Sequence, residues 1–171
     1  VLFFIILDIT EIKNELSDVA LKYINPKSYV EIFKKLERLN RESEQYIKKM
    51  IEVIAEVLNK NNIIHSINSR IKNIYGVHKC LIEGKKINEI HDLIAIKILV
   101  ENISDCYTAL GLIHSKYKPI NDKFKDYIAS PKTNMYQSLH TTVFGEGEYI
   151  IQIQVRTYQM EKIAYLGITS Y

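Results

Sequence analysis

Tryptophan is absent from this 171-residue chain, and glycine, proline and cysteine are scarce, with 6, 3 and 2 residues. So little glycine and proline excludes collagen-like and low-complexity compositions. Two cysteines are too few for a scaffold held by disulfides. Cys80 and Cys106 have no CxxC spacing and no neighbouring histidine pair, so we expect reduced thiols and a cytoplasmic location.

Long hydrophobic runs are also missing. The opening stretch Val1–Leu7 is apolar, but it is far shorter than the roughly 20 residues that cross a bilayer, so no membrane association is expected. It lacks the basic region and the small-residue cleavage site of a signal peptide. Because the chain does not begin with Met, we expect it to be a piece of a longer protein.

The residues that are present describe a globular protein, with 47% hydrophobic and 25% charged side chains. The net charge of +3 is too small to indicate nucleic-acid binding, so no direct DNA binding is expected. The basic excess lies between residues 70 and 132, where an anionic small ligand fits better than a duplex. Solvated surface lysines are the alternative explanation.

Two regions of different texture predict two domains. Residues 1–61 read as a helical linker or extension, in which Asn25-Pro26 ends one helix and Ser28 caps a longer one. Residues 62–171 alternate between strands and helices, which predicts a mixed sheet with helices packed on it. The expected strands lie near 63–67, 93–100, 127–129, 139–144 and 148–156, and the expected helices at 73–83, 104–116 and from 158 onward.

The segment 126–143 is the most informative part of the sequence. It places a lysine, an asparagine, a tyrosine and a histidine within eighteen residues, which is too polar for a core element and too apolar for a linker. Such a segment is typical of a ligand-binding loop that runs into a strand. Ordinary turn chemistry at 130–134, followed by an exposed strand, is the alternative.

Three further patterns point to phosphate chemistry. Arg70 and Lys72 enter a helix whose first N–H groups are free to bind phosphate. Asp92 opens a buried strand, where a carboxylate can hold Mg²⁺ against phosphate oxygens, or can simply bond to a loop. The dipeptide at 91–92 also occurs in metal-dependent phosphohydrolases, but the other histidines lack the required spacing, and we reject that assignment.

The strand at 148–156 is the clearest of all. Its apolar residues alternate with Gln152, Gln154 and Arg156, so these three polar side chains project from one face of the sheet. They predict the wall of a site. An edge strand that faces water would show the same alternation.

Together these segments resemble the synthetase domain of the RelA/SpoT alarmone enzymes. The helical part resembles the linker that follows the hydrolase domain in long members, through Ile12-Lys-Asn-Glu-Leu-Ser-Asp18 and Tyr23-Ile-Asn-Pro26. The resemblance covers nearly the whole chain, and residues 124–143 are its most specific part. The other matching stretches are Phe124-Lys-Asp126-Tyr-Ile-Ala, Pro131-Lys132, Asn134, Tyr136-Gln-Ser-Leu-His140-Thr-Thr-Val, Gln154-Val-Arg-Thr, Arg70 with Lys72, and Asp92-Leu-Ile-Ala.

The resemblance implies an α/β (α+β) fold like that of polymerase-β-type nucleotidyltransferases, with a mixed five-stranded sheet. It implies transfer of the β,γ-pyrophosphate of ATP to the 3′-hydroxyl of GDP or GTP in the stringent response, with Mg²⁺ as cofactor. Asp92 would hold the Mg²⁺, Tyr136 would stack on guanine, and Asp92 and Gln152 occupy the catalytic positions. The implied ATP contacts are Arg70, Lys72, Lys79 and Lys97, and the implied GDP or GTP contacts are Lys125, Lys132, Asn134, Tyr136, Gln137, His140, Gln154 and Arg156.

Three positions depart from the family pattern. Gln152 replaces a Glu that activates the acceptor hydroxyl, and an amide neither accepts a proton nor binds Mg²⁺ well. Lys97 replaces an Arg that stacks on adenine, and Ser69 replaces a Gly of the phosphate loop. Strand alternation also places Asp92 and Lys97 on opposite faces, unless Asp92 lies at a bulge or at the strand end.

Two functions therefore stay open at this point. One is an alarmone synthetase, slowed by Gln152. The other is a pseudo-synthetase that binds guanine nucleotide and regulates a hydrolase domain of the same parent chain, or a ribosome-linked partner. The residues implied for the acceptor nucleotide are complete, whereas those for catalysis and ATP are altered, which favours nucleotide binding over fast turnover.

Overall fold

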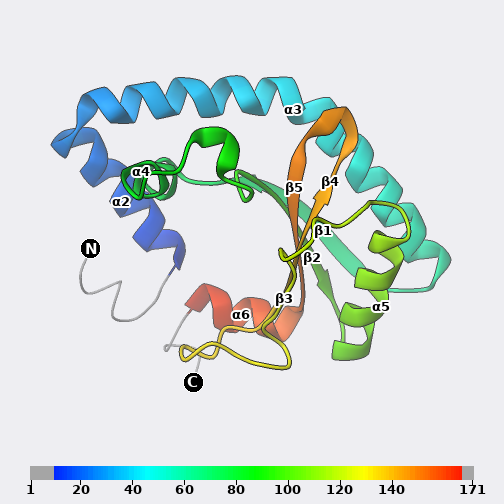
Figure 1. The fold of residues 1–171 in the computed structure, drawn as a ribbon. Coiled ribbons are helices and arrows are strands. Elements are labelled where there is room, and N and C mark those ends of the chain that lie inside the picture. The colour runs from blue at the N-terminus through cyan, green and yellow to red at the C-terminus, as the bar shows by residue number, and fades with distance from the viewer. Residues whose placement is uncertain (1–9, 167–171) are drawn as a thin grey trace.

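A computed structural model describes residues 10–166 of the chain (Figure 1). It opens with two helices, α2 (Thr10–Ile24) and α3 (Pro26–Lys60), separated at Asn25 as the sequence predicts. The predicted cap of α3 is wrong, because the side chain of Asn25 accepts the N–H of Ser28 at 3.2 Å and is itself the cap. Pro26 then takes the first helical position, where its missing N–H costs nothing.

Within residues 10–166, five strands form one mixed sheet with the order β1-β2-β5-β4-β3. Only β2 and β5 are parallel, and the other neighbours are antiparallel. This architecture confirms the predicted fold class. The remaining elements are β1 (His65–Ile71), α4 (Ile74–Ile82), β2 (Ile94–Val100), α5 (Ile103–His114), β3 (Lys125–Asp126), β4 (Leu139–Phe144), β5 (Ile150–Thr157) and α6 (Tyr158–Leu166), with 3-10 turns at Ile87–Glu89 and Glu146–Glu148.

Several strand bounds and one helix cap differ from their predictions: β1 extends to Ile71 instead of 67, β5 begins at Ile150 instead of 148, and β3 lies at Lys125–Asp126 instead of 127–129. β1 begins two residues later than expected, because the N–H of Ile63 still bonds to α3 through the carbonyl of Leu58. β3 ends at Asp126 because that carboxylate accepts the N–H groups of the two residues at 128 and 129 and turns the chain. Asn102, and not Ser104, caps α5 by accepting the N–H of Asp105 at 2.9 Å.

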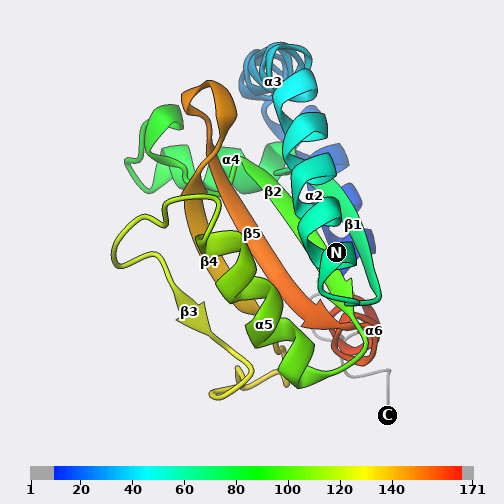
Figure 2. The ribbon, with the colours of Figure 1, turned by 90° about the vertical axis from the view of Figure 1, so that its right-hand side faces the viewer.

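One face of the sheet carries the main core. The second half of α3 and all of α5 cover this face (Figure 2). A second, smaller core joins α2, the first half of α3 and α4. Because α3 belongs to both cores, the helical segment packs directly on the sheet, and the domain boundary at residue 61 stays a prediction. Fully buried members of the main core include Met50, Leu58, Ile96, Ile98, Leu139, Ile153 and Val155.

The structure also describes the state of the two cysteines and the apolarity of the helices. Both cysteines are free thiols, and burial raises the pKa of Cys106 to about 12. Among residues 10–166, no helix is both long enough and apolar enough to cross a membrane. The apolar stretch at the start of the chain, Val1–Leu7, lies outside the described residues.

Candidate functional site

The face of the sheet opposite the main core is polar. The register of the strands aligns one residue from each of the five strands in a row across this face. In a second row, Arg70, Gln152 and Thr142 are aligned on β1, β5 and β4. Because successive residues of a strand point to opposite faces, the apolar neighbours of these residues enter the core. The first row consists of Asn68, Lys97, Gln154, His140 and Lys125.

Two cavities open on this polar face, of about 590 Å³ and about 420 Å³. They share three lining residues, Asp92, His140 and Gln152. The first cavity collects residues that the resemblance assigned to both nucleotides, and Lys125 lines the second. The predicted site residues that line the first cavity are Arg70, Asp92, Lys97, Lys132, Tyr136, His140, Gln152, Gln154 and Arg156.

Four predicted residues line neither cavity. Lys72 forms an ion pair with Asp92 beside the cavities, and Lys79 is exposed on α4. Asn134 is exposed, and its side-chain oxygen accepts the N–H of Tyr136 at 3.3 Å. Gln137 turns away to donate to the carbonyl of residue 128 at 3.4 Å. The structure therefore gives Asn134 and Gln137 a contact that shapes the loop around Tyr136.

Asp92 lies just before β2, so it takes the strand-end position that lets it share a cavity with Lys97. Its Oδ2 lies 2.5 Å from Nζ of Lys72, in a partly buried ion pair. Residues 10–166 hold no group of three or more His, Cys, Asp or Glu side chains that could bind a metal. A single carboxylate does fit Mg²⁺ that is shared with phosphate oxygens, because Mg²⁺ keeps most of its ligands from water and substrate.

The two glutamines of β5 are bonded to each other. Gln154 is 4% exposed, and its Nε2 donates to Oε1 of Gln152 at 2.6 Å. This bond directs the side-chain oxygen of Gln152 toward Gln154, because an amide oxygen accepts and an amide nitrogen donates. The N–H₂ group of Gln152 is then the part that can meet a ligand, and it can donate a hydrogen bond but cannot accept a proton.

Tyr136 is the centre of an aromatic and cationic cluster. Its hydroxyl lies 2.7 Å from Nε2 of His140, and the ring of Tyr127 meets both rings edge-on. Lys132 Nζ lies 5.0 Å from the centroid of the Tyr136 ring, and the guanidinium carbon of Arg156 lies 5.3 Å from it. Cations over an aromatic face are attracted by the ring quadrupole, so the cluster holds positive charge beside an aromatic plane.

Burial and these cations control the protonation of the cluster. Burial first, and then Lys132, Arg156 and Arg70, lower the pKa of His140 to about 4. Burial also raises the pKa of Tyr136. Both side chains are therefore uncharged at neutral pH, and the charge presented to a ligand comes from the lysine and the arginines.

Glu161 on α6 lines the first cavity and was not predicted from the sequence. Its Oε1 forms an ion pair with Lys97, and its Oε2 lies 2.7 Å from Nε of Arg156. Asn14 and Asn73 were also missed, and they come from α2 and the start of α4. One signal was available for Glu161, because it lies one turn into the helix that directly follows the site strand.

The predicted phosphate site at the start of α4 needs a correction. Its first N–H groups are not free, because Asp18 of α2 accepts the N–H of Ile74 at 3.2 Å and that of Tyr75 at 2.7 Å. Asp18 also accepts from the side chain of Asn73. A carboxylate from the helical segment thus occupies the position in which the sequence placed a phosphate.

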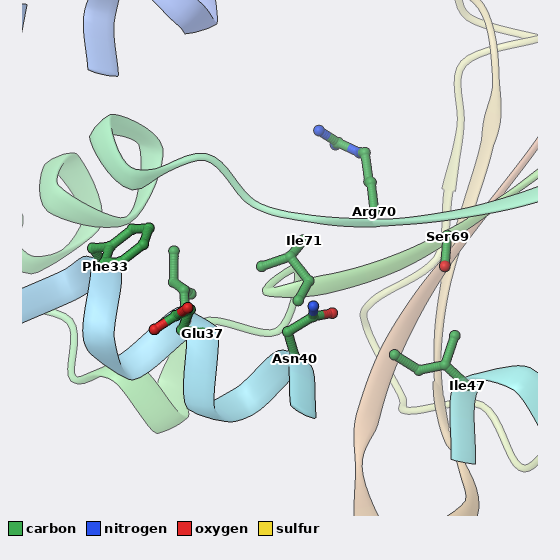
Figure 3. A pocket seen from close by; sticks show the side chains of 8 residues that line it. Phe33, Glu37, Asn40, Ile47, Ser69, Arg70 and Ile71 are labelled. Atoms are coloured by element: carbon green, nitrogen blue, oxygen red, sulfur yellow. The ribbon is translucent and has the colours of Figure 1, made fainter. Parts of the chain in front are cut away.

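A third cavity, of about 370 Å³, lies between α3 and β1 (Figure 3). Figure 3 shows Ser69 and Ile71 pointing toward α3, whereas Arg70 points the opposite way, as strand alternation requires. Of the predicted site residues, only Arg70 borders this cavity. The side chain of Arg70 therefore belongs to the polar face of the sheet.

Solved structures of alarmone synthetases have the same fold. The small alarmone synthetase 2 from Bacillus subtilis matches with a TM-score of 0.64 at 27% identity, over 78% of this chain and 77% of that one. The small alarmone synthetase 1 from the same organism, bound to its product pppGpp, matches with a TM-score of 0.59 at 21% identity, over 75% and 76%. The fold is thus that of alarmone synthetases.

Sequence comparison gives the family. Residues 69–171 match the region found in RelA / SpoT proteins. The GTP pyrophosphokinase of Myxococcus xanthus is 38% identical over 166 residues, and the bifunctional (p)ppGpp synthase/hydrolase RelA of Mycobacterium tuberculosis is 34% identical over 166. This chain belongs to the RelA/SpoT family, which confirms the resemblance. The match covers 96% of this chain but 22% of each of these two relatives, so the chain spans about a fifth of their length.

Proposed function

We propose that this chain binds ATP and GDP or GTP side by side and transfers pyrophosphate from ATP to the 3′-hydroxyl of the guanine nucleotide, with AMP as the other product. One observation carries the proposal. Two cavities on one face of the sheet meet at Asp92 and Gln152, the two positions that the family pattern makes catalytic. A reaction between two nucleotides needs such a junction.

The side chains present suit this chemistry, because pyrophosphoryl transfer depends mainly on positioning and on neutralising charge. Arg70 would contact the phosphates of ATP, and Lys97 would lie beside its adenine, where the family has an Arg. Lys125 and His140 would contact the acceptor nucleotide, whose base would stack on Tyr136. Asp92 would hold Mg²⁺, which neutralises charge on phosphate oxygens when it is bound. These substrates favour a cytoplasmic location. The similarity to a bifunctional (p)ppGpp synthase/hydrolase supports a hydrolase domain in the parent chain.

A second candidate function rests on the Gln152 amide. A synthetase with no carboxylate at this position lacks a group that can accept the proton of the acceptor hydroxyl. The observed hydrogen bond from Gln154 holds the amide in place, so the shape of the site survives while the base is missing. A chain that binds guanine nucleotide without fast turnover, and that acts on a hydrolase domain or a ribosome-linked partner, fits the same residues.

A product assay, together with calorimetric titration of GDP and GTP, tests both candidates. The chain is incubated with ATP, GDP or GTP and Mg²⁺, and AMP and a 3′-pyrophosphorylated guanosine nucleotide are quantified by anion-exchange chromatography. Formation of both products in equal amounts supports the synthetase. Binding of GDP without turnover supports the second candidate. If neither GDP nor GTP binds, both proposals are wrong.

A further inference from the structure

The ion pairs of Glu161 connect two cations that the family resemblance assigns to different nucleotides, Lys97 to ATP and Arg156 to GDP or GTP. Lys97 comes from β2, Arg156 from β5 and Glu161 from the first turns of α6. Their side chains are 25%, 8% and 20% exposed, so the group is largely shielded from water. Shielded charges interact more strongly than charges on an open surface.

Arg156 keeps a donor available within this arrangement. Its Nη1 is buried and has no hydrogen-bond partner among residues 10–166. Glu161 contacts the guanidinium through Nε, while Tyr136 lies against its guanidinium carbon. A buried N–H donor without a hydrogen-bond acceptor costs free energy. An anionic ligand that accepts a hydrogen bond from Nη1 would remove this cost.

Carboxylates are few in the first cavity. Asp92 and Glu161 are its only acidic lining residues in the described part of the chain, against four cations. Asp92 is already paired with Lys72. Among residues 10–166, Arg70 and Lys132 form no ion pair, whereas Lys97 and Arg156 are both paired with Glu161. Glu161 thus decides how much of the positive charge of the cavity is available to a ligand.

We propose that Glu161 is a specificity-determining residue, which limits how strongly the first cavity favours ligands with more phosphate charge. The inference rests on the proposed function, in which this cavity takes a nucleotide. The carboxylate repels phosphate oxygens directly and competes with them for Lys97. Both effects grow with the number of phosphate charges, so Glu161 weakens binding of a triphosphate more than that of a diphosphate and leaves an uncharged nucleoside unaffected.

The substitution Glu161→Gln tests the role of the negative charge at this position without changing the length of the side chain. The amide removes the negative charge but keeps the size and shape of the side chain, with one oxygen still facing the cations. Glu52→Gln is the matched control, because it removes the same charge from an exposed residue of α3 that does not line the first cavity. Thermal unfolding shows whether each variant is folded. If Glu161→Gln is not folded, Glu161→Asn, which has a shorter amide side chain, replaces it in the test.

The experiment measures affinity by isothermal titration calorimetry for guanosine, GMP, GDP, GTP and inorganic pyrophosphate at constant ionic strength. We expect Glu161→Gln to raise the affinity for GDP about 3-fold and for GTP about 10-fold, and to leave guanosine within about 2-fold, because the effect is Coulombic. Glu52→Gln should resemble the unaltered chain. A guanosine affinity that changes as much as the GTP affinity, or weaker GTP binding, would overturn the proposal.

Pyrophosphate distinguishes a failure of this inference from a failure of the proposed function. If no guanine compound binds to either chain but Glu161→Gln binds pyrophosphate more tightly, the role of Glu161 is supported and the proposed function is wrong. If pyrophosphate and GTP bind equally well to both chains, Glu161 does not set the charge preference, and the nucleotide site itself is unaffected.

Discussion

Gln154 donates a hydrogen bond of 2.6 Å to the side-chain oxygen of Gln152, where the two cavities meet. Because Gln154 is buried, this bond fixes the side chain that stands at the family's catalytic Glu position. A carboxylate at residue 152 could accept the same hydrogen bond without any movement of β5. A Glu side chain at position 152 is therefore compatible with the observed backbone of β5.

Restoring the family residue should raise activity. Gln152→Glu supplies a group that can accept the proton of the acceptor hydroxyl, and such assistance is worth about 10²–10⁴ in rate. We expect AMP formation from ATP and GDP to rise by at least about 10²-fold. The gain should vanish in the double variant with Asp92→Ala. A Gln152→Glu chain that is no faster would show that residue 152 does not take the proton.

Tyr136 offers a test of base stacking. Tyr136→Ala should weaken GDP binding by about 1–3 kcal/mol, because an aromatic face under a base contributes that amount. Tyr136→Phe keeps the ring and loses only the contact with His140, so its affinity should stay close to that of the unaltered chain. Calorimetric titration with GDP measures both. Equal losses in the two variants would place the role of Tyr136 in its hydroxyl.

His140 should make stability depend on pH in the acid range. Its pKa is lowered to about 4 in the folded chain, below the ordinary value of 6.5, so the unfolded chain binds the proton first. The stabilisation is complete above pH 6.5 and is lost as the pH falls toward 4. By linkage the loss reaches about 2.5 kcal/mol at pH 4.5.

The comparison is urea unfolding at pH 7 and pH 4.5 for the unaltered chain and for His140→Gln. Carboxylates also titrate in this range, but they do so in both chains, so the difference between the chains isolates His140. The variant should lose less stability on acidification. If both chains lose the same amount, the ring of His140 is protonated as easily in the folded state as in the unfolded state.

Asp92 should link Mg²⁺ to ATP binding. Asp92→Asn removes the carboxylate that Mg²⁺ needs while it keeps the shape, so added Mg²⁺ should no longer strengthen ATP binding. Lys72→Met should have the opposite effect, because Asp92 then loses its 2.5 Å ion-pair partner and half-saturation should need less Mg²⁺. ATP titrations of each variant in Mg²⁺ and in EDTA measure how ATP affinity depends on Mg²⁺. An unchanged Mg²⁺ response in both variants would exclude Asp92 as the ligand.

Asp18 of α2 should stabilise the fold because it caps α4, a helix more than fifty residues away in the sequence. It caps α4 from α2, and loss of a capping side chain costs about 0.5–2 kcal/mol. Asp18→Ala should lower the urea midpoint accordingly, and Glu15→Ala, at an exposed position of the same helix α2, is the control for loss of charge. No change in Asp18→Ala would show that water replaces the cap without loss.

Local patterns in the sequence were enough to predict a mixed sheet and three side chains of its polar face. The alternation along β5 placed Gln152, Gln154 and Arg156 on one face, and the apolar run of β2 indicated an interior strand. Both follow from the two-residue period of a strand, which needs no knowledge of the neighbouring strands. The positions of helix caps were less predictable, since several side chains near each helix start could accept the same N–H.

The contacts that sequence reasoning missed join distant segments. Asp18 and the start of α4 are more than fifty residues apart, and Lys97 and Glu161 more than sixty. Such pairs depend on how α2 packs on α4 and how α6 packs on the sheet, which local periodicity does not encode. Lys79 of α4 lines neither cavity, and its contact with ATP stays a prediction. Its helix is near the cavities, but its side chain is exposed.

The row of polar side chains that crosses the sheet makes binding depend on strand alignment. A slip of β4 by one residue would replace His140 with Thr141 on the polar face and would push an imidazole into the apolar interior. Such a misaligned chain would lose its ligands and its packing together. Any partly folded form that still binds a nucleotide must therefore already have its central strands correctly matched.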